Sequence, residues 1–393
     1  MGSRREKKQS VKPRKRRRAA KVTARVSSTP DERFMRRALE LAALHQGFVE
    51  PNPMVGCVIV KQGRVIGEGA HERYGGPHAE VNALRFAGVA ARGATVYVNL
   101  EPCAHHGKTP PCAEALIRAG ATRVVAAMRD PFELVQGRGF DQLRQAGIRV
   151  DIGTLAGEAA ALNAPFLKRV QQGRPWVILK WAQSIDGRIA TRSGDSKWIS
   201  DEICRAHAHE VRGRVDAIVV GVNTVLRDDP MLTCRLAAPR RVARRIVLDT
   251  DLRTPPDCAL ARSAHEVETW VVCGDLAAHR ARAAALRKAG VHVESMSGAD
   301  GCTNIEALLT LLGTSGATNV LVEGGGRVIG EFFERQLGDE IHAYIAPLLI
   351  GGDRASGPLR GRGAKTVQEA LRLPRGCTMR PLGDGWIFQG RLW

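Results

Sequence analysis

The sequence predicts an α/β fold arranged as two successive domains, and three observations support this prediction. Short apolar segments alternate with segments of helical periodicity from residue 30 onward, a pattern typical of α/β proteins. A length of 393 residues is enough for two or three ordinary domains. A polar stretch ending at residues 171–175 interrupts the alternation, which begins again at Trp176. No internal repeat relates the two halves, so the two domains are expected to differ.

The composition excludes several classes of protein. Hydrophobic residues make up 44% of the chain and charged residues 25%, as in soluble globular proteins. No stretch approaches the ~18 apolar residues of a membrane span, so no membrane partner is expected. The polybasic start lacks the apolar core of a signal peptide. Nine cysteines without framework spacing fit a reducing compartment, so we expect a cytoplasmic protein.

Much of the positive charge lies in one terminal stretch. The net charge is +19, but residues 1–29 alone contain 12 Lys or Arg and one Glu. Such a run is solvated, and we expect a basic disordered tail over 1–29. Two alternative roles for this tail are nonspecific binding of nucleic acid and a targeting signal. The favoured interpretation is a dispensable extension.

The first half of the chain alternates helices and strands. Apolar residues from Phe34 to Leu44 recur at helical spacing, and Gly47 suits the end of that helix. Two strands around Gln62-Gly63 predict a hairpin. The remaining predicted elements follow in chain order, with the strands at 55–60, 64–69, 94–99, 123–128 and 149–152 and the helices at 78–87 and 139–146.

One stretch of this half carries the residues of a metal site. His78 is followed two residues later by Glu80, and Cys103 and Cys112 come further along. Zinc favours nitrogen and sulfur ligands in tetrahedral geometry, and a His with two thiolates leaves one position open. Glu80 is then free to move protons. Zinc deaminases show this order of residues, although eight residues separate the two cysteines here instead of two.

The alternative for each of these residues is a structural role. A His-Ala-Glu tripeptide occurs often by chance, and a cysteine is commonly only a small buried hydrophobe. Taken singly, each residue is better read as structural. Taken together, after strand-like runs and with Cys112 at a predicted helix N-terminus that favours the thiolate, they indicate zinc.

The second half repeats the α/β pattern. Its predicted strands lie at 177–181, 217–220, 245–248, 269–273, 319–322 and 342–347, and its helices at 200–212, 277–289 and 328–335. The strand at 319–322 runs into Glu323 and three glycines before a helix begins. Such a turn allows backbone amides to approach an anion at the helix N-terminus, but it is equally consistent with a tight turn. Arg212 and Arg235 are candidate phosphate partners.

These motifs together resemble the bifunctional riboflavin-biosynthesis deaminase–reductases, in which the deaminase precedes the reductase. In the first half the resemblance rests on PNPMVGCVIV, GGPHAEVNAL, VNLEPCAHHGKTPPCAEALI and GRGFDQLRQAGI. In the second half it rests on LKWAQSIDGRIA, SGDSKWIS, GVNTVLRDDPMLTCR and VEGGGRVIGEF. The resemblance implies a cytidine-deaminase-like domain followed by a dihydrofolate-reductase-like domain. We expect the former at 30–152, a linker at 153–174 and the latter at 175–393.

The resemblance also implies two reactions and their cofactors. A zinc-dependent step removes the 2-amino group of a diaminopyrimidinone that bears a phosphoribosylamino substituent. An NADPH-dependent step then reduces the ribosyl chain to ribityl. The implied zinc ligands are His78, Cys103 and Cys112, and Glu80 is the implied catalytic proton carrier. Lys180 and Asp186 lie near the reduction site by motif position, and their proton roles are left open.

Further contacts follow from matching positions. Asn52 and the loop with His105 and His106 are implied to line the pyrimidine pocket. The implied substrate contacts of the reductase are Ser196, Arg212, Leu232, Arg235 and Glu323. The implied NADPH contacts are Ala182, Trp198, Thr224, Asp228, Gly325, Gly326, Arg327, Val328, Ile329, Gly330 and Glu331.

The chain departs from the family pattern at one loop, and other readings of the sequence remain. Family members show Asp-Pro-Asn-Pro where this chain has Asp130-Pro131-Phe132-Glu133. One alternative function is a nucleic-acid deaminase with an RNA-binding tail, and another is a nonenzymatic nucleic-acid-binding protein. The spacing of the cysteines and the intact catalytic positions weigh against these. The expected partners are a small-molecule substrate and further copies of the chain, in a dimer or tetramer.

Overall fold

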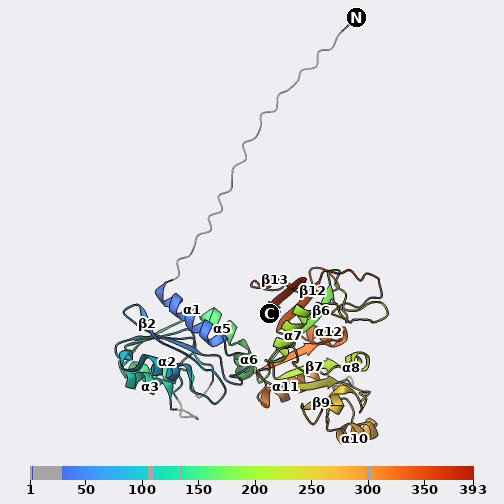
Figure 1. The fold of residues 1–393 in the computed structure, drawn as a ribbon, viewed down its shortest axis with the longest axis horizontal. Coiled ribbons are helices and arrows are strands. Elements are labelled where there is room, and N and C mark those ends of the chain that lie inside the picture. Colours follow the sequence, from blue (N-terminus) through green and yellow to red (C-terminus); the bar gives the residue numbers. More distant parts are fainter. Residues whose placement is uncertain (1, 3–28, 105–109, 133–134, 299–301) are drawn as a thin grey trace.

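The computed structural model describes residues 2, 29–104, 110–132, 135–298 and 302–393, which form two domains joined by a helical segment (Figure 1). The expected basic tail therefore lies outside the described residues, apart from Gly2 and Thr29. Each domain contains one β-sheet. Both sheets have helices packed on their two faces, so the predicted α/β class is confirmed.

The first domain is built on a five-stranded sheet of order β2-β1-β3-β4-β5. Strand β1 pairs antiparallel with β2 and β3, whereas β3, β4 and β5 run parallel. Its strands are β1 (Gly56–Lys61), β2 (Arg64–Ala70), β3 (Thr95–Val98), β4 (Arg123–Ala126) and β5 (Arg149–Ile152). Its helices are α1 (Pro30–Ala43), α2 (Ala79–Ala87), the 3-10 helix Gly88–Ala91, α3 (Cys112–Ala119) and α4 (Arg138–Gln145).

Alternation along the strands explains the layers. In β1, Cys57 and Ile59 face a core shared with α2, α3 and α4, while Val58 and Val60 face a second core shared with α1. Successive side chains of a strand point to opposite faces, so an unbroken apolar run is what a sheet covered on both sides requires. The predicted hairpin and helices of this half are confirmed within a few residues. Helix α1 ends at Ala43, so Gly47 does not end it.

The segment between the domains is helical. Residues 153–174, expected as a linker, contain α5 (Ala156–Leu162) and α6 (Ala164–Gln172). In Figure 1 they lie between the two sheets. Ala159 of α5 packs in the same core as α1, and Lys168 of α6 forms an ion pair of 2.5 Å with Asp339 of the second domain. The segment therefore packs on both domains.

The second domain has a nine-stranded sheet of order β10-β9-β8-β7-β11-β6-β12-β14-β13. The strands from β10 to β12 run parallel, and β14 and β13 complete the edge in antiparallel pairing. The strands are β6 (Trp176–Ser184), β7 (Ala217–Gly221), β8 (Arg244–Leu248), β9 (Thr269–Cys273), β10 (His292–Ser295), β11 (Asn319–Glu323), β12 (Glu340–Ala346), β13 (Thr378–Leu382) and β14 (Gly385–Arg391). The helices are α7 (Glu202–Arg212), α8 (Val222–Asp228), α9 (Ala259–Arg262), the 3-10 helix Ala277–His279, α10 (Arg280–Lys288), α11 (Ile305–Thr314) and α12 (Gly326–Glu334).

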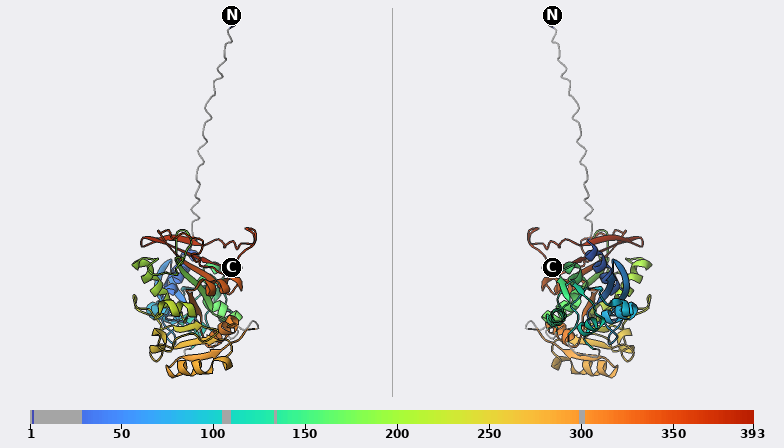
Figure 2. Two further views of the ribbon diagram at one scale, coloured as in Figure 1. Left: turned by 90° about the vertical axis from the view of Figure 1, so that its right-hand side faces the viewer. Right: turned by 90° about the vertical axis from the view of Figure 1, so that its left-hand side faces the viewer.

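The sequence located the central strands of this sheet but not its edges. Strands β10, β13 and β14 and helices α8, α9 and α11 were not predicted. Strand β13 is exposed or half-buried along its length, so it lacks the apolar alternation that marks a strand. Figures 1 and 2 show β13 and α10 at opposite ends of the domain, as the strand order requires.

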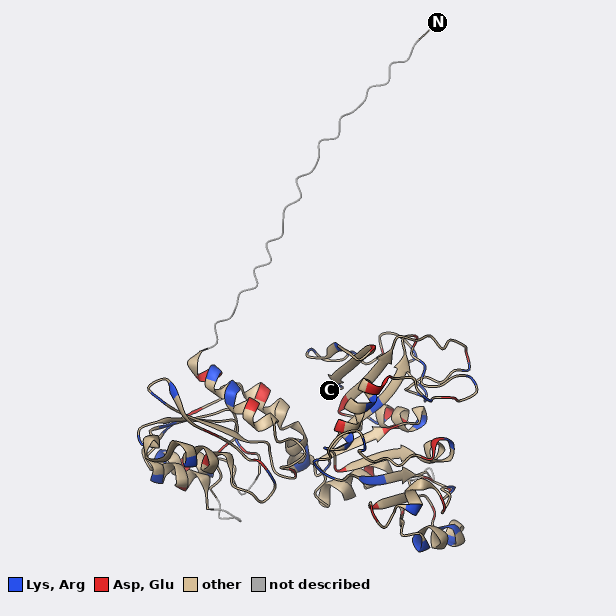
Figure 3. Ribbon diagram, in the orientation of Figure 1, with Lys and Arg blue, Asp and Glu red and all other residues tan. Residues whose placement is uncertain are grey.

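Charged residues are spread over both domains. Figure 3 shows basic and acidic residues interspersed on the helices and loops of each domain. Within the described residues, no helix is both long and apolar enough to cross a membrane.

Candidate active sites

The three predicted zinc ligands meet at one point of the first domain. His78 is the residue before α2, Cys103 follows the loop after β3, and Cys112 begins α3. Nδ1 of His78 lies 3.2 Å from Sγ of Cys112 and 3.5 Å from Sγ of Cys103. A tetrahedral zinc with ordinary bond lengths separates its nitrogen and sulfur ligands by about 3.6 Å. The three ligand atoms lie within 4.8 Å of one another, so their spacing fits one zinc ion.

A buried carboxylate supports the loop that carries Cys103. Glu101, 4% exposed, accepts hydrogen bonds from the backbone N–H groups of Gly137 and Gly139, each at 3.0 Å. A Cβ on Gly139 would lie only 1.9 Å from the carbonyl oxygen of Pro102, so only glycine permits this close approach. The sequence alone gives Glu101 no role, although it belongs to the Glu-Pro-Cys motif, because its partners lie some 36 residues further along the chain.

Electrostatics at the cluster favour the thiolate form of Cys103, whereas they raise the pKa values of Cys112, His78 and Glu80. Hydrogen bonding from Cys112, with His78 adding to it, lowers the pKa of Cys103 to about 4. The pKa of His78 is raised, chiefly by its hydrogen bond with Cys103. Glu80 lies in the first turn of α2 and is 3% exposed, and burial raises its pKa. A raised pKa makes this carboxylate a stronger base than an exposed glutamate, which suits a group that takes up and returns a proton.

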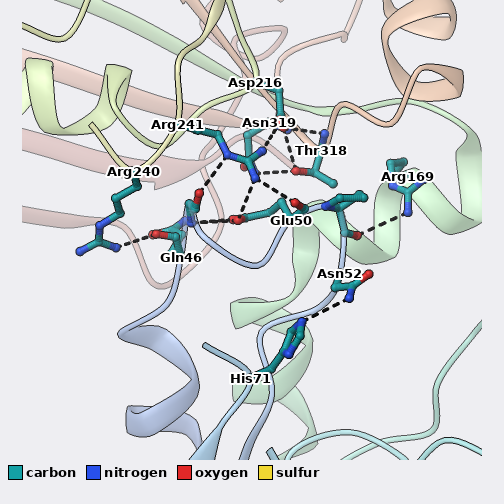
Figure 4. Close-up of polar contacts among 12 residues, drawn as sticks. Gln46, Glu50, Asn52, His71, Arg169, Asp216, Arg240, Arg241, Thr318 and Asn319 are labelled. Carbon is teal, nitrogen blue, oxygen red and sulfur yellow. Dashed lines mark hydrogen bonds and ion pairs between the residues drawn. The ribbon is translucent and has the colours of Figure 1, made fainter. Parts of the chain in front are cut away.

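The cluster opens into a pocket of about 330 Å³, which is large enough for a small heterocycle. Asn52, predicted to contact the pyrimidine, lines this pocket, and its Nδ2 lies 3.2 Å from Nε2 of His71 (Figure 4). Nδ1 of His71 lies 3.0 Å from the carbonyl oxygen of Pro77. With Nδ1 donating there, Nε2 is left to accept from Asn52, which fixes the amide of Asn52 at the pocket wall.

Several pocket residues were not predicted. His71 comes from the end of β2, and Phe166, Arg169 and Val170 come from α6 in the segment expected as a linker. The apolar residues of that segment give no sign from sequence alone that they face a site. The departing loop contributes Asp130 and Phe132 to the pocket, so an aromatic ring stands where family members have asparagine. His105, His106 and Glu133 lie outside the described residues.

In the second domain a buried ion pair lies at the end of the central strands. Glu323, the last residue of β11, receives two hydrogen bonds of 2.7 Å from Nε and Nη2 of Arg212 at the end of α7. Lys180 of β6 lies 3.7 Å from the same carboxylate. Burial raises the pKa of Glu323, but the charges of Arg212 and Lys180 outweigh this and lower it to about 2. Arg212, predicted as a phosphate partner, is therefore hydrogen-bonded to a carboxylate within the protein.

The glycine turn follows directly after Glu323. Gly324 and Gly325 have φ values of +82° and +71°, which residues with side chains rarely adopt. A Cβ on Gly324 would lie 3.1 Å from Oγ1 of Thr224, so the turn packs closely against the N-terminal part of α8. At Gly325 the nearest atom to such a Cβ would be 3.7 Å away. Within the protein, glycine is required at 325 by its backbone conformation and not by lack of space.

The remaining predicted contacts divide into those that gather near this turn and those that lie elsewhere. Thr224 and Asp228 lie on α8, and Gly326 to Glu331 form the first turns of α12. A Cβ placed on Gly194 would lie 3.1 Å from Nη1 of Arg227, which belongs to α8. The loop that contains Gly194, Ser196 and Trp198 therefore lies beside α8. The backbone N–H of Arg235 donates to Nδ1 of His209 on α7 at 2.9 Å.

The other positions have structural partners in this structure. The side chain of Ala182 packs against a core containing Cys204 and Tyr344, and its backbone pairs with Tyr344 of β12 in the sheet. Leu232 is buried with a φ of +50°. Asp186 accepts hydrogen bonds from the backbone N–H groups of Ile350 and Gly351, at 3.0 and 2.8 Å, so its carboxylate holds a turn.

Two family models match the chain, one in each domain. Residues 28–128 match the cytidine and deoxycytidylate deaminase zinc-binding region. Residues 175–379 match the RibD C-terminal domain. The first match includes all three ligands of the metal cluster, and the second includes the ion pair and the glycine turn.

Relatives match over nearly the whole chain. The riboflavin biosynthesis protein RibD of Actinobacillus pleuropneumoniae is 43% identical over 86% of this chain and 90% of its own. That of Aquifex aeolicus is 41% identical over 91% and 97%. Among solved structures, Acinetobacter baumannii RibD aligns with a TM-score of 0.78 at 35% identity, covering 92% of this chain and 98% of its own. A Thermotoga maritima diaminohydroxyphosphoribosylaminopyrimidine deaminase/5-amino-6-(5-phosphoribosylamino)uracil reductase aligns with a TM-score of 0.77 at 34% identity, covering 93% and 99%.

Proposed function

Because the chain belongs to the RibD family of bifunctional riboflavin-biosynthesis deaminase–reductases, we propose how its own residues carry out the two reactions. The expected cytidine-deaminase-like and dihydrofolate-reductase-like folds are confirmed with the family, as are the cofactors zinc and NADPH. The observation that carries the assignment is the joint presence of the zinc cluster and the reductase domain in one chain. A nucleic-acid deaminase is not favoured, because the family match covers both domains.

In the first domain, we propose that His78, Cys103 and Cys112 hold zinc. Zinc held in this way lowers the pKa of a coordinated water molecule to near 7. Glu80 takes one proton from the attacking water and delivers it to the pyrimidine ring nitrogen as the new C–O bond forms. It then takes the second proton from that oxygen and delivers it to the amino group, which leaves as ammonia when the C–N bond breaks. Its burial keeps it away from bulk solvent, and the nearby Asn52 holds the substrate ring at the pocket wall.

In the second domain, we propose that the turn at Gly325 and the start of α12, from Gly326 to Glu331, hold NADPH. The N-terminus of a helix of this length offers free N–H groups to a phosphate. NADPH supplies the hydride for the ribosyl carbon. Further contacts to it are assigned to Ala182, Trp198, Thr224 and Asp228.

The substrate of the second reaction lies, in this proposal, against the end of β11. The residues assigned to it are Ser196, Arg212, Leu232, Arg235 and Glu323. The pair of Arg212 and Glu323 presents a rigid donor and acceptor surface, because each group is fixed by the other at 2.7 Å.

We also propose the limits and assembly of the domains. The deaminase domain comprises residues 30–152, residues 153–174 join the domains, and the reductase domain comprises residues 175–393. We propose that the enzyme works in the cytoplasm as a homo-oligomer, a dimer or a tetramer. The exposed side chain of Met379 on the edge strand β13 supports contact with a second copy. The mass of the purified protein in solution, measured by light scattering, tests this.

A two-step assay tests the function. Purified protein is incubated with 2,5-diamino-6-(5-phosphoribosylamino)pyrimidin-4-one, first without and then with NADPH. We expect one equivalent of ammonia in both cases, and one equivalent of NADPH oxidised only when it is supplied. Release of ammonia without any NADPH oxidation would contradict the second activity. Absence of ammonia from zinc-loaded protein would contradict the first.

A further inference from the structure

Arg241 of the reductase domain holds the loop that leads into the deaminase pocket. Nε of Arg241 donates to the carbonyl oxygen of Gly47, and its Nη2 donates to that of Glu50, both at 2.9 Å. Its Nη1 forms an ion pair with Asp216 beside β7 (Figure 4). All three nitrogens of the guanidinium are thus engaged, two of them by the backbone of the other domain. This planar fork fixes orientation as well as distance.

The loop and the anchor are both rigid. The carboxylate of Glu50, 7% exposed, accepts the backbone N–H of Gly47 at 2.9 Å and lies 3.7 Å from Nη2 of Arg241. Asp216 in turn accepts hydrogen bonds of 2.8 Å from the backbone N–H groups of Thr318 and Asn319. Arg241 therefore connects residues 47–50 of the deaminase domain to the start of the central strands β7 and β11 of the reductase domain.

The domains approach closely at the same place. Gly47 has a φ of +91°, and a Cβ there would lie 2.9 Å from Cβ of Arg214. Nη1 of Arg240 donates to the carbonyl oxygen of Gln46 at 2.6 Å. Gly47, which sequence reasoning placed at a helix end, instead serves the contact between domains.

The loop continues directly into the deaminase pocket. Pro51, Asn52 and Pro53 all line the pocket, and the carbonyl of Glu50, held by Arg241, belongs to the peptide bond before Pro51. We propose that Arg241 is a positioning residue for deamination: through the backbone of residues 47–50 it sets where Asn52 meets the pyrimidine. This inference rests on the proposed function of Asn52 and on the deaminase activity.

A second element of the pocket is held by the reductase domain independently. Helix α6 lines the pocket through Phe166, Arg169 and Val170. Lys168 of the same helix pairs with Asp339 at 2.5 Å, and Asp339 also accepts the backbone N–H of Val177 in β6 at 2.7 Å. Helix α6, which forms one wall of the deaminase pocket, is therefore held by the reductase domain. The loop that carries Asn52 must be held by the same domain to keep its place relative to this wall.

The test is the kinetics of Arg241→Ala in the full chain. A misplacement of about 1 Å in a positioning contact can cost roughly 100-fold, and we expect a rise of roughly 10- to 100-fold in the KM for deamination. The kcat should change by less than about threefold, because zinc and Glu80 are untouched. Zinc content and the reductase kinetics on 5-amino-6-(5-phosphoribosylamino)uracil should match wild type, while the thermal midpoint of unfolding should fall, because Asp216 and the buried Glu50 lose the guanidinium.

A matched control separates loop positioning from general docking of the domains. Arg391→Ala removes another contact to the joining segment, from Nη2 to the carbonyl oxygen of Ala161 at 2.7 Å, which does not line the pocket. Its deaminase KM should stay within about twofold of wild type. Equal rises in both variants would overturn the proposal in favour of a general docking effect.

A double-mutant cycle tests the route through Asn52. If Arg241 acts by placing Asn52, then Arg241→Ala should add little to the KM of Asn52→Ala, whereas independent effects would multiply. Full multiplication would overturn the proposal, as would an unchanged KM in the single variant. If the wild-type protein itself released no ammonia, the proposed function and not the positioning would have failed.

Discussion

The two active sites are built from different parts of the polypeptide. The proposed deaminase site is made of side chains, with three candidate ligand atoms within 4.8 Å and a buried acid beside them. The proposed NADPH site is made largely of backbone, with two glycines at positive φ before a helix N-terminus. Side-chain chemistry is specific to residue type, so it leaves a strong sequence motif, whereas a backbone cradle shares its glycines with ordinary tight turns. The comparison predicts that side-chain substitutions will have the larger effects.

The largest effect is expected from removing a zinc ligand. Cys103→Ser replaces the thiolate with a poorer ligand at a site that has only three protein ligands. We expect loss of most bound zinc and deamination at background level, with normal reduction of the aminouracil substrate. Elemental analysis of purified protein measures the metal. Cys302→Ser, which changes an exposed cysteine outside the cluster, should keep its zinc. Full zinc in the Cys103 variant would contradict the ligand assignment.

The next effect separates the proton carrier from the ligands. Glu80→Gln keeps the size of the side chain but removes its base. General acid–base groups contribute roughly 10²- to 10⁴-fold, and we expect a loss of kcat in or above that range. Zinc content and reductase activity should be unchanged, since Glu80 is not a ligand. Deamination at a near-normal rate would exclude Glu80 as the carrier.

The backbone site is tested at Gly325. A valine at φ +71° is strained by about 1–3 kcal/mol, and its side chain would project where the cofactor is proposed to lie. We expect the KM for NADPH to rise roughly tenfold or more, since 1.4 kcal/mol corresponds to tenfold. Ammonia release should be normal, and the aminouracil ribosyl phosphate should accumulate.

The effect of strain alone is measured at another glycine that also has a positive φ. Gly316 has a φ of +95°, and no atom lies within 4 Å of a Cβ placed on it. Gly316→Val should lower the thermal midpoint as Gly325→Val does but leave the KM for NADPH unchanged. A rise in KM in both variants would show that strain in the domain, and not contact with the cofactor, accounts for the effect.

The smallest expected effect is a loss of stability of the reductase domain at low pH. Burial lowers the pKa of His209 to about 4, and its Nδ1 accepts the N–H of Arg235, which requires the neutral ring. An unfolded His has a pKa near 6.5, so the unfolded state binds more protons between pH 6.5 and 4. The stability contributed by neutral His209 is therefore fully present above pH 6.5 and is lost as the pH falls from 6.5 to 4.

A variant that does not titrate should reduce this loss. His209→Asn keeps an acceptor near the position of Nδ1, and between pH 7 and 4.5 its thermal midpoint should fall less than that of wild type, by roughly 2–4 °C. His207, whose pKa burial also lowers to about 4, accounts for part of the remaining slope. An identical slope in the His209 variant would contradict the assignment.

The sequence by itself determined the α/β class, the order of the domains and the central strands of both sheets, and it predicted the three residues that meet at the candidate zinc site. Each of these depends on local information: period-two apolar runs, helical spacing, or residue types with a specific chemistry. His78, Cys103 and Cys112 were identified because a borderline metal accepts few kinds of ligand.

Only the tertiary structure decided how the pocket is completed and held. His71, Phe166 and Arg169 reach the deaminase pocket from a strand end and from a helix expected as a linker. Arg241 acts on a loop 191 residues earlier in the chain. Such contacts depend on how two domains pack, and packing is set by the summed burial of many residues, which leaves no local pattern in the sequence. The same reason explains β13, whose place at the sheet edge is given by its partner β14 and not by its own residues.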